Sequence, residues 1–356
     1  MSGKTGQRRF ETRHGPDSFK LQILREGKAV DMEEAGVTKS LRPVVSVTDL
    51  VKRYGDVLAL DHFNLSIGEG EIFGLLGPNG CGKTTAMNCM LQLLAYDKGD
   101  IRLFGEPMSP TRYDLKRRIG VVPQQVAVFD ELTVAENVDC FCALYVSDKK
   151  RRRALVDEAI EFVGLEDYRR MRPRKLSGGL LRRLNIACGI AHKPELIFFD
   201  EPTVAVDPQS RNAILDGIVR LRDEGATVVY TSHYMEEVEQ ICTRIMIMDG
   251  GRILAQGTND ELKRGIAVGE KIVVELPGAP DARGRAAAST VRALPHVIGC
   301  EFAKGELRAT CEASERNLLD VLEALKAARV AVGRVYSEPP TLNDVFLEIT
   351  GRELRD

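Results

Sequence analysis

The segment from Leu176 to Asp207 reads LSGGLLRRLNIACGIAHKPELIFFDEPTVAVD, and it decides the fold. It opens with a glycine-containing turn before an apolar-faced helix and continues into an apolar run, ELIFFDE, that ends in two carboxylates. Ser177 can cap the helix, and bare glycines let a helix N-terminus approach an anion closely. That anion need not belong to the same chain. The run that ends in Asp200 and Glu201 predicts a buried strand with two acids at its end.

A second glycine-rich stretch, GPNGCGKTT, follows the apolar run EIFGLL. Its pattern is GxxxxGK[ST] between a strand and a helix, which is the context that a nucleotide phosphate loop needs. Glycines let the backbone turn and direct its amides at phosphate oxygens, while Lys83 supplies positive charge at the β- and γ-phosphates. The Thr84 hydroxyl is placed for Mg²⁺. We therefore predict nucleotide binding by Gly77, Pro78, Asn79, Gly80, Cys81, Gly82, Lys83, Thr84 and Thr85.

The two acids of FFDEP add hydrolysis to nucleotide binding. Asp200 is predicted to orient Mg²⁺, directly or through water, and Glu201 to polarise the attacking water beside the γ-phosphate. The plainer interpretation is a pair of solvated acids at a strand end. The phosphate loop upstream argues against it, because nucleotide hydrolysis needs such groups.

Composition excludes several classes of protein. The net charge of the 356-residue chain is -2, which gives no bulk argument for nucleic acid, and we expect no nucleic-acid partner. No run approaches the roughly 18 consecutive apolar residues of a membrane-spanning helix. The eight cysteines show no metal-ligand spacing, which favours reduced thiols over a disulfide framework. The basic run Lys149–Arg153 is interpreted as the solvated start of a helix rather than a site for nucleic acid or lipid.

The hydrophobic pattern divides the chain into three regions. Residues 1–44 are polar and aperiodic, which predicts a disordered N-terminal extension. Residues 45–264 alternate strands with helices, the βαβ pattern of an α/β domain with a parallel sheet. Residues 265–356 read strand, helix, strand, strand, helix, strand and a last helix, which indicates a small C-terminal α+β domain of ferredoxin-like topology.

A helical lobe is expected inside the second region. Residues from about 126 to 192 carry a helical pattern throughout, between two halves of the sheet. One helix should begin at Thr133, because Thr133-Val-Ala-Glu136 fits a capping box. Another should run from Thr84 to Leu94, after the phosphate loop. Strands are expected at VVSVTDLVKRYG, HFNLSI, EIFGLL, RIGVVP, ELIFFD, ATVVYTS and RIMIMD.

The order of these motifs resembles that of one family. GPNGCGKTT, VPQQ, LSGG, FFDEP, VAVD and TSH follow one another as in the nucleotide-binding subunit of an ATP-binding cassette (ABC) transporter. The resemblance covers residues 45–264 and implies a RecA-like P-loop NTPase core with an antiparallel β subdomain. It also implies an ATPase that binds ATP and Mg²⁺ and works as a homodimer.

In that family the LSGG segment is called the signature. The signature of one chain closes over ATP that is held by the phosphate loop of the other chain. The resemblance therefore implies that Ser177, Gly178 and Gly179 bind the γ-phosphate of the second chain's ATP. Asp207 of VAVD resembles the D-loop residue that crosses the dimer interface. Asp200 and Glu201, by contrast, would serve the ATP bound to their own chain.

Three further roles follow from the resemblance. Gln124 of VPQQ resembles the Q-loop glutamine, which senses Mg²⁺ and the membrane partner, although Gln125 stands beside it. His233 of TSHYMEE resembles the switch histidine at the γ-phosphate, where the plainer interpretation is an ordinary loop histidine. Tyr54 of KRYG resembles the aromatic residue that stacks on adenine, where the plainer interpretation is a strand residue packed on the sheet.

Three positions depart from the family pattern. Leu180 stands where the signature usually has Gln, behind the Ser-Gly-Gly contacts, so activity is expected to survive. Cys81 replaces a small Ala or Ser, and a helix N-terminus should make its thiol ionise more readily, so that thiol reagents would block ATP binding. Ala205 stands where glycine is common, and we attach no consequence to it.

A second resemblance narrows the kind of ABC protein. The segment CGIAHKPELIFFDEPTVAVDPQSRN and the tail EPPTLNDVFLEITGRELRD resemble ATPases of ABC-2-type exporters, the daunorubicin-resistance group. This implies a separate permease with several membrane-spanning helices and a cargo such as a drug, lipid or other small amphiphile. It also implies a peripheral location at the cytoplasmic face of a prokaryotic cell membrane.

Other functions remain open at this point. A non-transport ABC ATPase could act on ribosomes or DNA, but such proteins usually carry two cassettes or a long coiled coil, and this chain has neither. An importer would usually carry a different regulatory tail. A regulatory ATPase with a vestigial site is disfavoured by the presence of Lys83, Asp200, Glu201 and His233.

Overall fold

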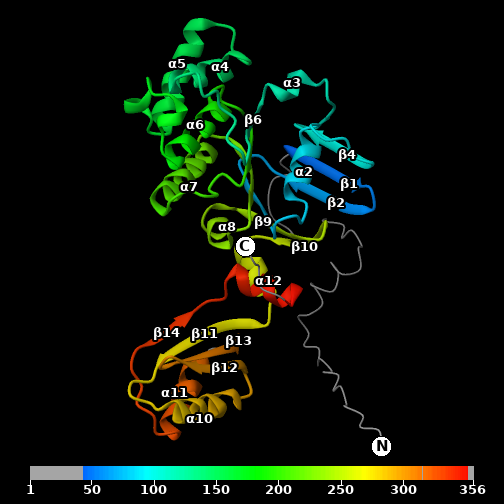
Figure 1. Ribbon diagram of the computed structural model, residues 1–356. Coiled ribbons are helices and arrows are strands. Elements are labelled where there is room, and N and C mark those ends of the chain that lie inside the picture. The colour runs from blue at the N-terminus through cyan, green and yellow to red at the C-terminus, as the bar shows by residue number, and fades with distance from the viewer. Residues whose placement is uncertain (1–42, 315, 352–356) are drawn as a thin grey trace, which may run out of the picture. The chain divides into compact units, whose positions relative to one another are not determined.

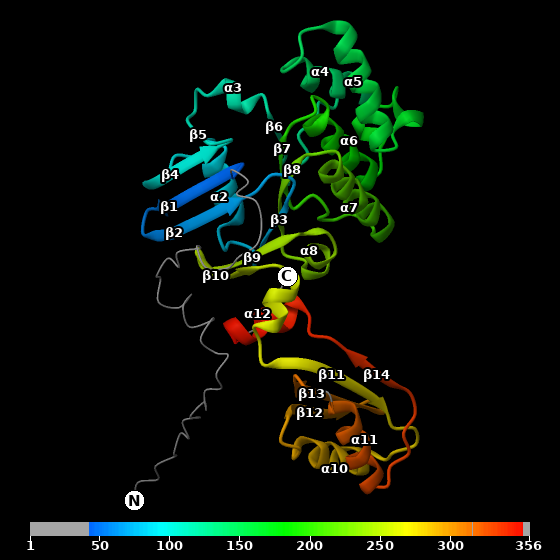
Figure 2. The ribbon, with the colours of Figure 1, turned by 180° about the vertical axis from the view of Figure 1, so that it is seen from behind.

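The computed structural model describes residues 43–314 and 316–351. The predicted N-terminal extension, residues 1–44, lies almost entirely outside these described residues. The described chain contains three sheets and a group of helices (Figures 1 and 2). None of its helices is both long enough and apolar enough to cross a bilayer.

The first sheet is antiparallel and has the strand order β2-β1-β4-β5. Its inward side chains, among them Leu50, Leu60 and Phe63, are fully buried. The sequence pattern predicted β1 and part of β2 but not β4 and β5, whose apolar residues are too few to form a clear pattern. The strands are β1 (Val45–Tyr54), β2 (Val57–Ile67), β4 (Lys98–Leu103) and β5 (Glu106–Pro107).

The second sheet carries the site and has the order β10-β9-β3-β8-β7-β6. All its pairings are parallel except that of the edge strand β10. Every residue of β3, β7 and β8 is buried, which explains their continuous apolar runs. The strands are β3 (Ile72–Leu76), β6 (Ile119–Val122), β7 (Leu196–Asp200), β8 (Thr227–Ser232), β9 (Arg244–Asp249) and β10 (Arg252–Gly257).

Further helices connect the strands of these two sheets or follow them in the chain. The helix after the phosphate loop ends at Met90, four residues before the predicted end, and Gln92 follows it with a φ of 54°. The helices are α2 (Lys83–Met90), α3 (Tyr113–Lys116), α7 (Pro208–Asp223), α8 (Met235–Ile241) and α9 (Asn259–Arg264).

A helical lobe with its own buried core lies between β6 and β7 in the chain (Figure 1). The capping box predicted at Thr133 is confirmed, because its side chain accepts from the Glu136 backbone N–H while the Glu136 carboxylate accepts from the Thr133 N–H. The helices of the lobe are α4 (Val134–Ala143), α5 (Lys149–Phe162) and α6 (Gly178–Ile190).

The C-terminal sheet is antiparallel throughout, with the order β12-β13-β11-β14. Together with its two helices this is the predicted βαββαβ arrangement of a ferredoxin-like domain. The last strand is shorter than the apolar run suggested. The elements are β11 (Val268–Glu275), α10 (Asp281–Arg292), β12 (Val297–Ala303), β13 (Glu306–Glu312), α11 (Asn317–Ala327) and β14 (Val335–Glu338).

The last helix, α12 (Leu342–Thr350), leaves the C-terminal sheet and returns to the core around β3 and β8. Leu342, Val345 and Phe346 are buried in that core. The carboxylate of Glu239 on α8 accepts from the Leu342 backbone N–H. The final helix therefore belongs structurally with the parallel sheet.

Candidate active site

The phosphate loop joins β3 to α2 and directs Lys83 inward. The Lys83 ammonium donates to the Gly77 carbonyl at 2.7 Å and to the Pro78 carbonyl at 3.2 Å, and the residue is 4% exposed. Gly82 has a φ of 111°, and a Cβ there would lie 2.7 Å from the Ala59 carbonyl oxygen, so only glycine fits. The loop can therefore hold an anion against the start of a helix.

Cys81 behaves differently from the prediction. It is 3% exposed, and burial raises the pKa of its thiol, whereas the helix position was expected to lower it. A Cβ on Gly77 would come within 2.7 Å of the Cys81 sulfur, so the thiol packs beneath the loop. The predicted sensitivity to thiol reagents therefore loses its basis. The Cys81 backbone N–H donates to the Pro78 carbonyl at 3.2 Å within the loop.

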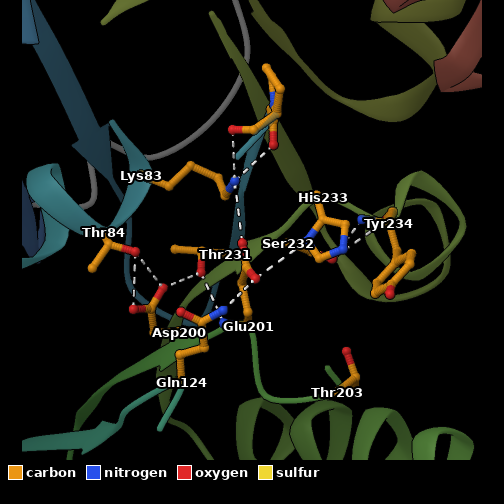
Figure 3. A network of polar contacts seen from close by, with 12 residues as sticks. Lys83, Thr84, Gln124, Asp200, Glu201, Thr203, Thr231, Ser232, His233 and Tyr234 are labelled. Carbon is orange, nitrogen blue, oxygen red and sulfur yellow. Dashed lines mark hydrogen bonds and ion pairs between the residues drawn. The ribbon is translucent and has the colours of Figure 1, made fainter. Parts of the chain in front are cut away.

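Asp200 and Thr84 face one another across the end of β7. The Thr84 hydroxyl lies 3.1 Å from both Asp200 carboxylate oxygens, and the Thr231 hydroxyl donates to Asp200 Oδ1 at 2.7 Å (Figure 3). Burial raises the pKa of the Asp200 carboxyl. Hard oxygen ligands grouped in this way fit Mg²⁺, and a cation there would favour the charged carboxylate.

Glu201 is the centre of the site. Its Oε1 lies 3.3 Å from Lys83 Nζ, its Oε2 accepts from Gln124 Nε2 at 3.0 Å, and the same oxygen lies 3.3 Å from His233 Nδ1. The residue is 5% exposed. Figure 3 shows these groups converging from the phosphate loop, the segment after β6 and the end of β8. A buried carboxylate with these partners is suited to hold and polarise a water molecule.

The backbone of Glu201 is also unusual. Its φ of 45° is left-handed, which costs a non-glycine residue about 1–2 kcal/mol. The Thr231 hydroxyl accepts from the Glu201 N–H at 3.0 Å and helps to hold this conformation. Strain of this kind concentrates at functional sites. The conformation aims the side chain at Lys83 and His233.

Two residues that the sequence analysis missed hold the Gln124 loop. Arg182 is 6% exposed and donates to the carbonyls of Pro123 at 3.2 Å and Gln124 at 2.7 Å. Asn185 donates to the Pro123 carbonyl at 3.1 Å and accepts from the Ala127 N–H at 3.0 Å. Both lie on α6, the helix that LSGG opens. Polar residues on the buried face of a predicted helix were the available signal.

The signature turn lies apart from this cluster. Ser177 caps α6 by accepting from the Leu180 N–H at 3.3 Å, and both Ser177 and Gly178 are exposed. A Cβ on Gly178 would meet nothing within 4 Å, whereas one on Gly179 would lie 2.5 Å from the Ser210 hydroxyl. Within the described residues, no hydrogen bond or ion pair joins Ser177, Gly178 or Gly179 to the phosphate loop. Leu180 packs against the core of the helical lobe, which accounts for an apolar residue there.

The remaining predicted residues are accessible. Tyr54 ends β1, is 50% exposed and lies under the Lys52 ammonium at 5.1 Å from its ring centre. Asn79 and Gly80 are exposed at the tip of the phosphate loop, and Thr85 is half-buried in the first turn of α2. Asp207 is exposed and caps α7, accepting from the Ser210 N–H at 2.9 Å. In the part of the chain that the structure describes, no hydrogen bond or ion pair joins Tyr54 or Asp207 to Lys83 or Glu201.

Ala205 has a strained backbone conformation that the sequence did not indicate. Its φ of 59° is left-handed, which explains why glycine suits this position. Ala205→Gly is expected to raise the free energy of unfolding by about 1 kcal/mol by removing strain. Ala154→Gly, at an exposed site within α5, should lower it by a similar amount. Thermal unfolding of both variants tests this, and two shifts of the same sign would contradict it.

Known proteins share both the sequence and the fold. Residues 60–204 match the ABC transporter family, and residues 257–350 match the C-terminal domain of DrrA1-3-like ATP-binding proteins. The linearmycin resistance ATP-binding protein LnrL of Bacillus subtilis is 36% identical, over 88% of this chain and 100% of its own. The daunorubicin resistance ATP-binding protein DrrA3 of Streptomyces coeruleorubidus is 36% identical, over 87% of this chain and 97% of its own.

A solved structure extends the comparison. The dimeric ATP-binding cassette MJ0796, in a post-hydrolysis state with ADP and Pi, is 27% identical with a TM-score of 0.56, over 60% of this chain and 98% of its own. The fold and the site thus define a P-loop ATPase of the cassette type. The chain belongs to the ATP-binding subunits of ABC transporters, and its C-terminal domain is of the DrrA-like kind.

Proposed function

We propose that two copies of this chain bind two ATP molecules with Mg²⁺ and hydrolyse them in sites that each copy completes for the other. The convergence of Lys83, Gln124 and His233 on the Glu201 carboxylate carries this proposal. Lys83 and the loop amides hold the phosphates, and Glu201 polarises the attacking water. Thr84, Gln124 and Asp200 would hold Mg²⁺, which would neutralise phosphate charge when bound.

The signature supports the part of the proposal that concerns a second chain. Ser177 and Gly178 are exposed at the start of a 13-residue helix, and open space surrounds Gly178. An anion can therefore approach this helix start closely. In the proposed homodimer the γ-phosphate held by the partner's phosphate loop is that anion. Asp207 lies at the same interface, and Tyr54 stacks on the adenine of its own chain's ATP.

The proposed role is export. Relatives that match 87% and 88% of this chain carry names of drug-resistance ATP-binding proteins. We infer that ATP hydrolysis here drives efflux of a drug, lipid or other small amphiphile through a separate permease, with this chain at the cytoplasmic face of the membrane. The permease supplies the membrane-spanning helices. Co-purification of this chain with a multi-spanning protein tests that assignment, and purification with ribosomes or DNA instead would contradict it.

A complementation experiment tests the shared site. Lys83→Ala removes the phosphate loop's charge, and Gly178→Asp puts a carboxylate where the signature should meet phosphate, in space that accepts a Cβ. Each variant alone should be inactive. Co-expressed, they should regain about a quarter of the wild-type ATPase rate, because half the dimers are mixed and each mixed dimer keeps one intact site.

The control substitution is Gly299→Asp in β12, where a Cβ also meets nothing within 4 Å. It should leave the ATPase rate unchanged. Inactive mixtures of the two site variants, or full activity of Gly178→Asp alone, would contradict a site made by two chains.

A further inference from the structure

A buried carboxylate behind the site, Glu237, has no role in the proposed chemistry. It lies on α8 and is 3% exposed. Its Oε2 accepts from three hydroxyls: Thr203 at 2.8 Å, Tyr230 at 2.7 Å and Ser232 at 3.0 Å. Its Oε1 lies 3.3 Å from Arg211 Nε on α7. A buried charge with so many partners holds several segments in one arrangement.

Two of these partners, Ser232 and Arg211, contact Tyr234, the residue that follows the switch histidine His233. The Ser232 hydroxyl accepts from the Tyr234 N–H at 2.9 Å, which fixes the backbone on both sides of His233. The Arg211 guanidinium lies 5.0 Å from the centre of the Tyr234 ring. The Tyr234 ring lies beside the His233 ring, with 4.1 Å between the ring centres (Figure 3). Glu237 thus supports the position of Tyr234 through both the main chain and the side chain.

The histidine ring depends on this support. His233 Nδ1 is buried without a hydrogen-bond partner, although it lies 3.3 Å from Glu201 Oε2. No hydrogen bond to the ring is found in the described chain, and the contacts that remain to orient it are the Tyr234 ring and the Glu201 carboxylate. A displacement of about 1 Å in a catalytic group can cost a hundredfold in rate.

Thr203 and Arg211 connect Glu237 to the segments that carry Glu201 and Asp207. Thr203 lies two residues after Glu201, and Arg211 lies one helical turn after Asp207, whose carbonyl accepts from the Arg211 N–H at 2.9 Å. Asp207 is exposed at the start of α7. The Glu237 carboxylate therefore connects α7, the exit from β7 and the end of β8.

We propose that Glu237 and Arg211 are positioning residues that hold His233 against Glu201 and couple it to the Asp207 segment. The proposal rests on the proposed hydrolytic role of His233 and Glu201. A second chain that displaces the start of α7 would move Arg211, and Arg211 would move Tyr234 and the histidine ring. In the described chain, neither positioning residue has a hydrogen bond or ion pair to the phosphate loop.

The first test compares two neighbouring acids. Glu237→Gln keeps the shape but removes the charge, and it should lower kcat about tenfold while KM for ATP changes less than twofold. Glu236→Gln makes the same change at an exposed position without partners in the described chain and should behave as wild type. Equal rates for the two variants would overturn the proposal, as would parallel losses of ATP binding and thermal stability in Glu237→Gln.

A second test replaces Arg211 and therefore does not depend on whether the Glu237→Gln variant folds. Arg211 is partly exposed, so Arg211→Gln should fold and should also lower kcat, whereas Arg211→Lys keeps the charge and should recover part of the rate. Full activity of Arg211→Gln would overturn its role.

A double-mutant cycle identifies the residue acted upon. In single-turnover assays, Glu237→Gln should have little further effect once His233 is replaced by alanine. If Glu237→Gln lowers the single-turnover rate by the same factor with His233 and with alanine at position 233, the proposal that Glu237 acts through His233 is overturned. If His233→Ala alone has the wild-type rate, the proposed hydrolytic role of His233 fails, and this positioning proposal fails with it.

Discussion

Lys83→Ala is expected to lower the affinity for ATP by at least about 100-fold, since charge-assisted hydrogen bonds contribute about 1.5–3 kcal/mol each. The two carbonyls that hold its ammonium, those of Gly77 and Pro78, fix the charge at the mouth of the phosphate loop. Alanine removes the ammonium charge while the Glu201 carboxylate stays buried. ATP binding therefore loses the attraction between ammonium and phosphate and is opposed by repulsion between carboxylate and phosphate. Isothermal titration with ATP measures the effect.

The control for this substitution is Lys98→Ala. Lys98 lies on β4, is 63% exposed at its side chain and pairs with Asp49, away from the phosphate loop. Its removal changes the net charge equally and should leave ATP affinity unchanged. An unaltered affinity in Lys83→Ala, with circular dichroism showing a folded protein, would contradict the assignment of the loop.

Glu201→Gln is expected to lower kcat by about 100-fold or more while ATP binding is kept, because a positioned general base contributes 10²–10⁴-fold. Glutamine preserves the shape between Lys83, Gln124 and His233 but cannot take a proton. The variant should therefore accumulate as an ATP-bound closed dimer. Steady-state ATPase assays and size-exclusion chromatography with ATP measure the two effects.

Glu195→Gln is the matched control. Glu195 immediately precedes the same strand, β7, at its opposite end, and pairs with Arg118 on the surface. Its loss should leave the ATPase rate close to that of the wild type. A wild-type rate in Glu201→Gln would refute the proposed role of that carboxylate.

The sequence placed the glycine-rich loop between a strand and a helix, and the structure shows β3 before it and α2 after it, for a physical reason. Phosphate binding needs glycine at particular backbone angles and a lysine at a fixed spacing, so the pattern around Gly82 and Lys83 is local. Buried parallel strands are continuous apolar runs, so β3, β7 and β8 were recognisable. The weakly apolar strands β4 and β5 were not, because their pairing with β1 depends on distant segments.

Cys81 shows where local reasoning fails. A helix N-terminus lowers the pKa of an accessible thiol, but this thiol packs beneath Gly77, and the desolvation of its charged form outweighs the helix effect. Whether a side chain is buried depends on neighbours that are far away in the chain. Ala205 is similar, since its left-handed backbone became evident only in the folded loop.

The sequence by itself was enough to predict the phosphate loop, the paired acids, the signature turn and the order of the domains, because each prediction rests on spacing and pattern within one segment. Only the tertiary structure decided what meets at Glu201, which draws Lys83, Gln124 and His233 from three separate segments. It also decided that Arg182 and Asn185 hold the Gln124 loop and that Glu237 ties three segments together. Contacts of this kind join residues far apart in the chain, so no local pattern encodes them.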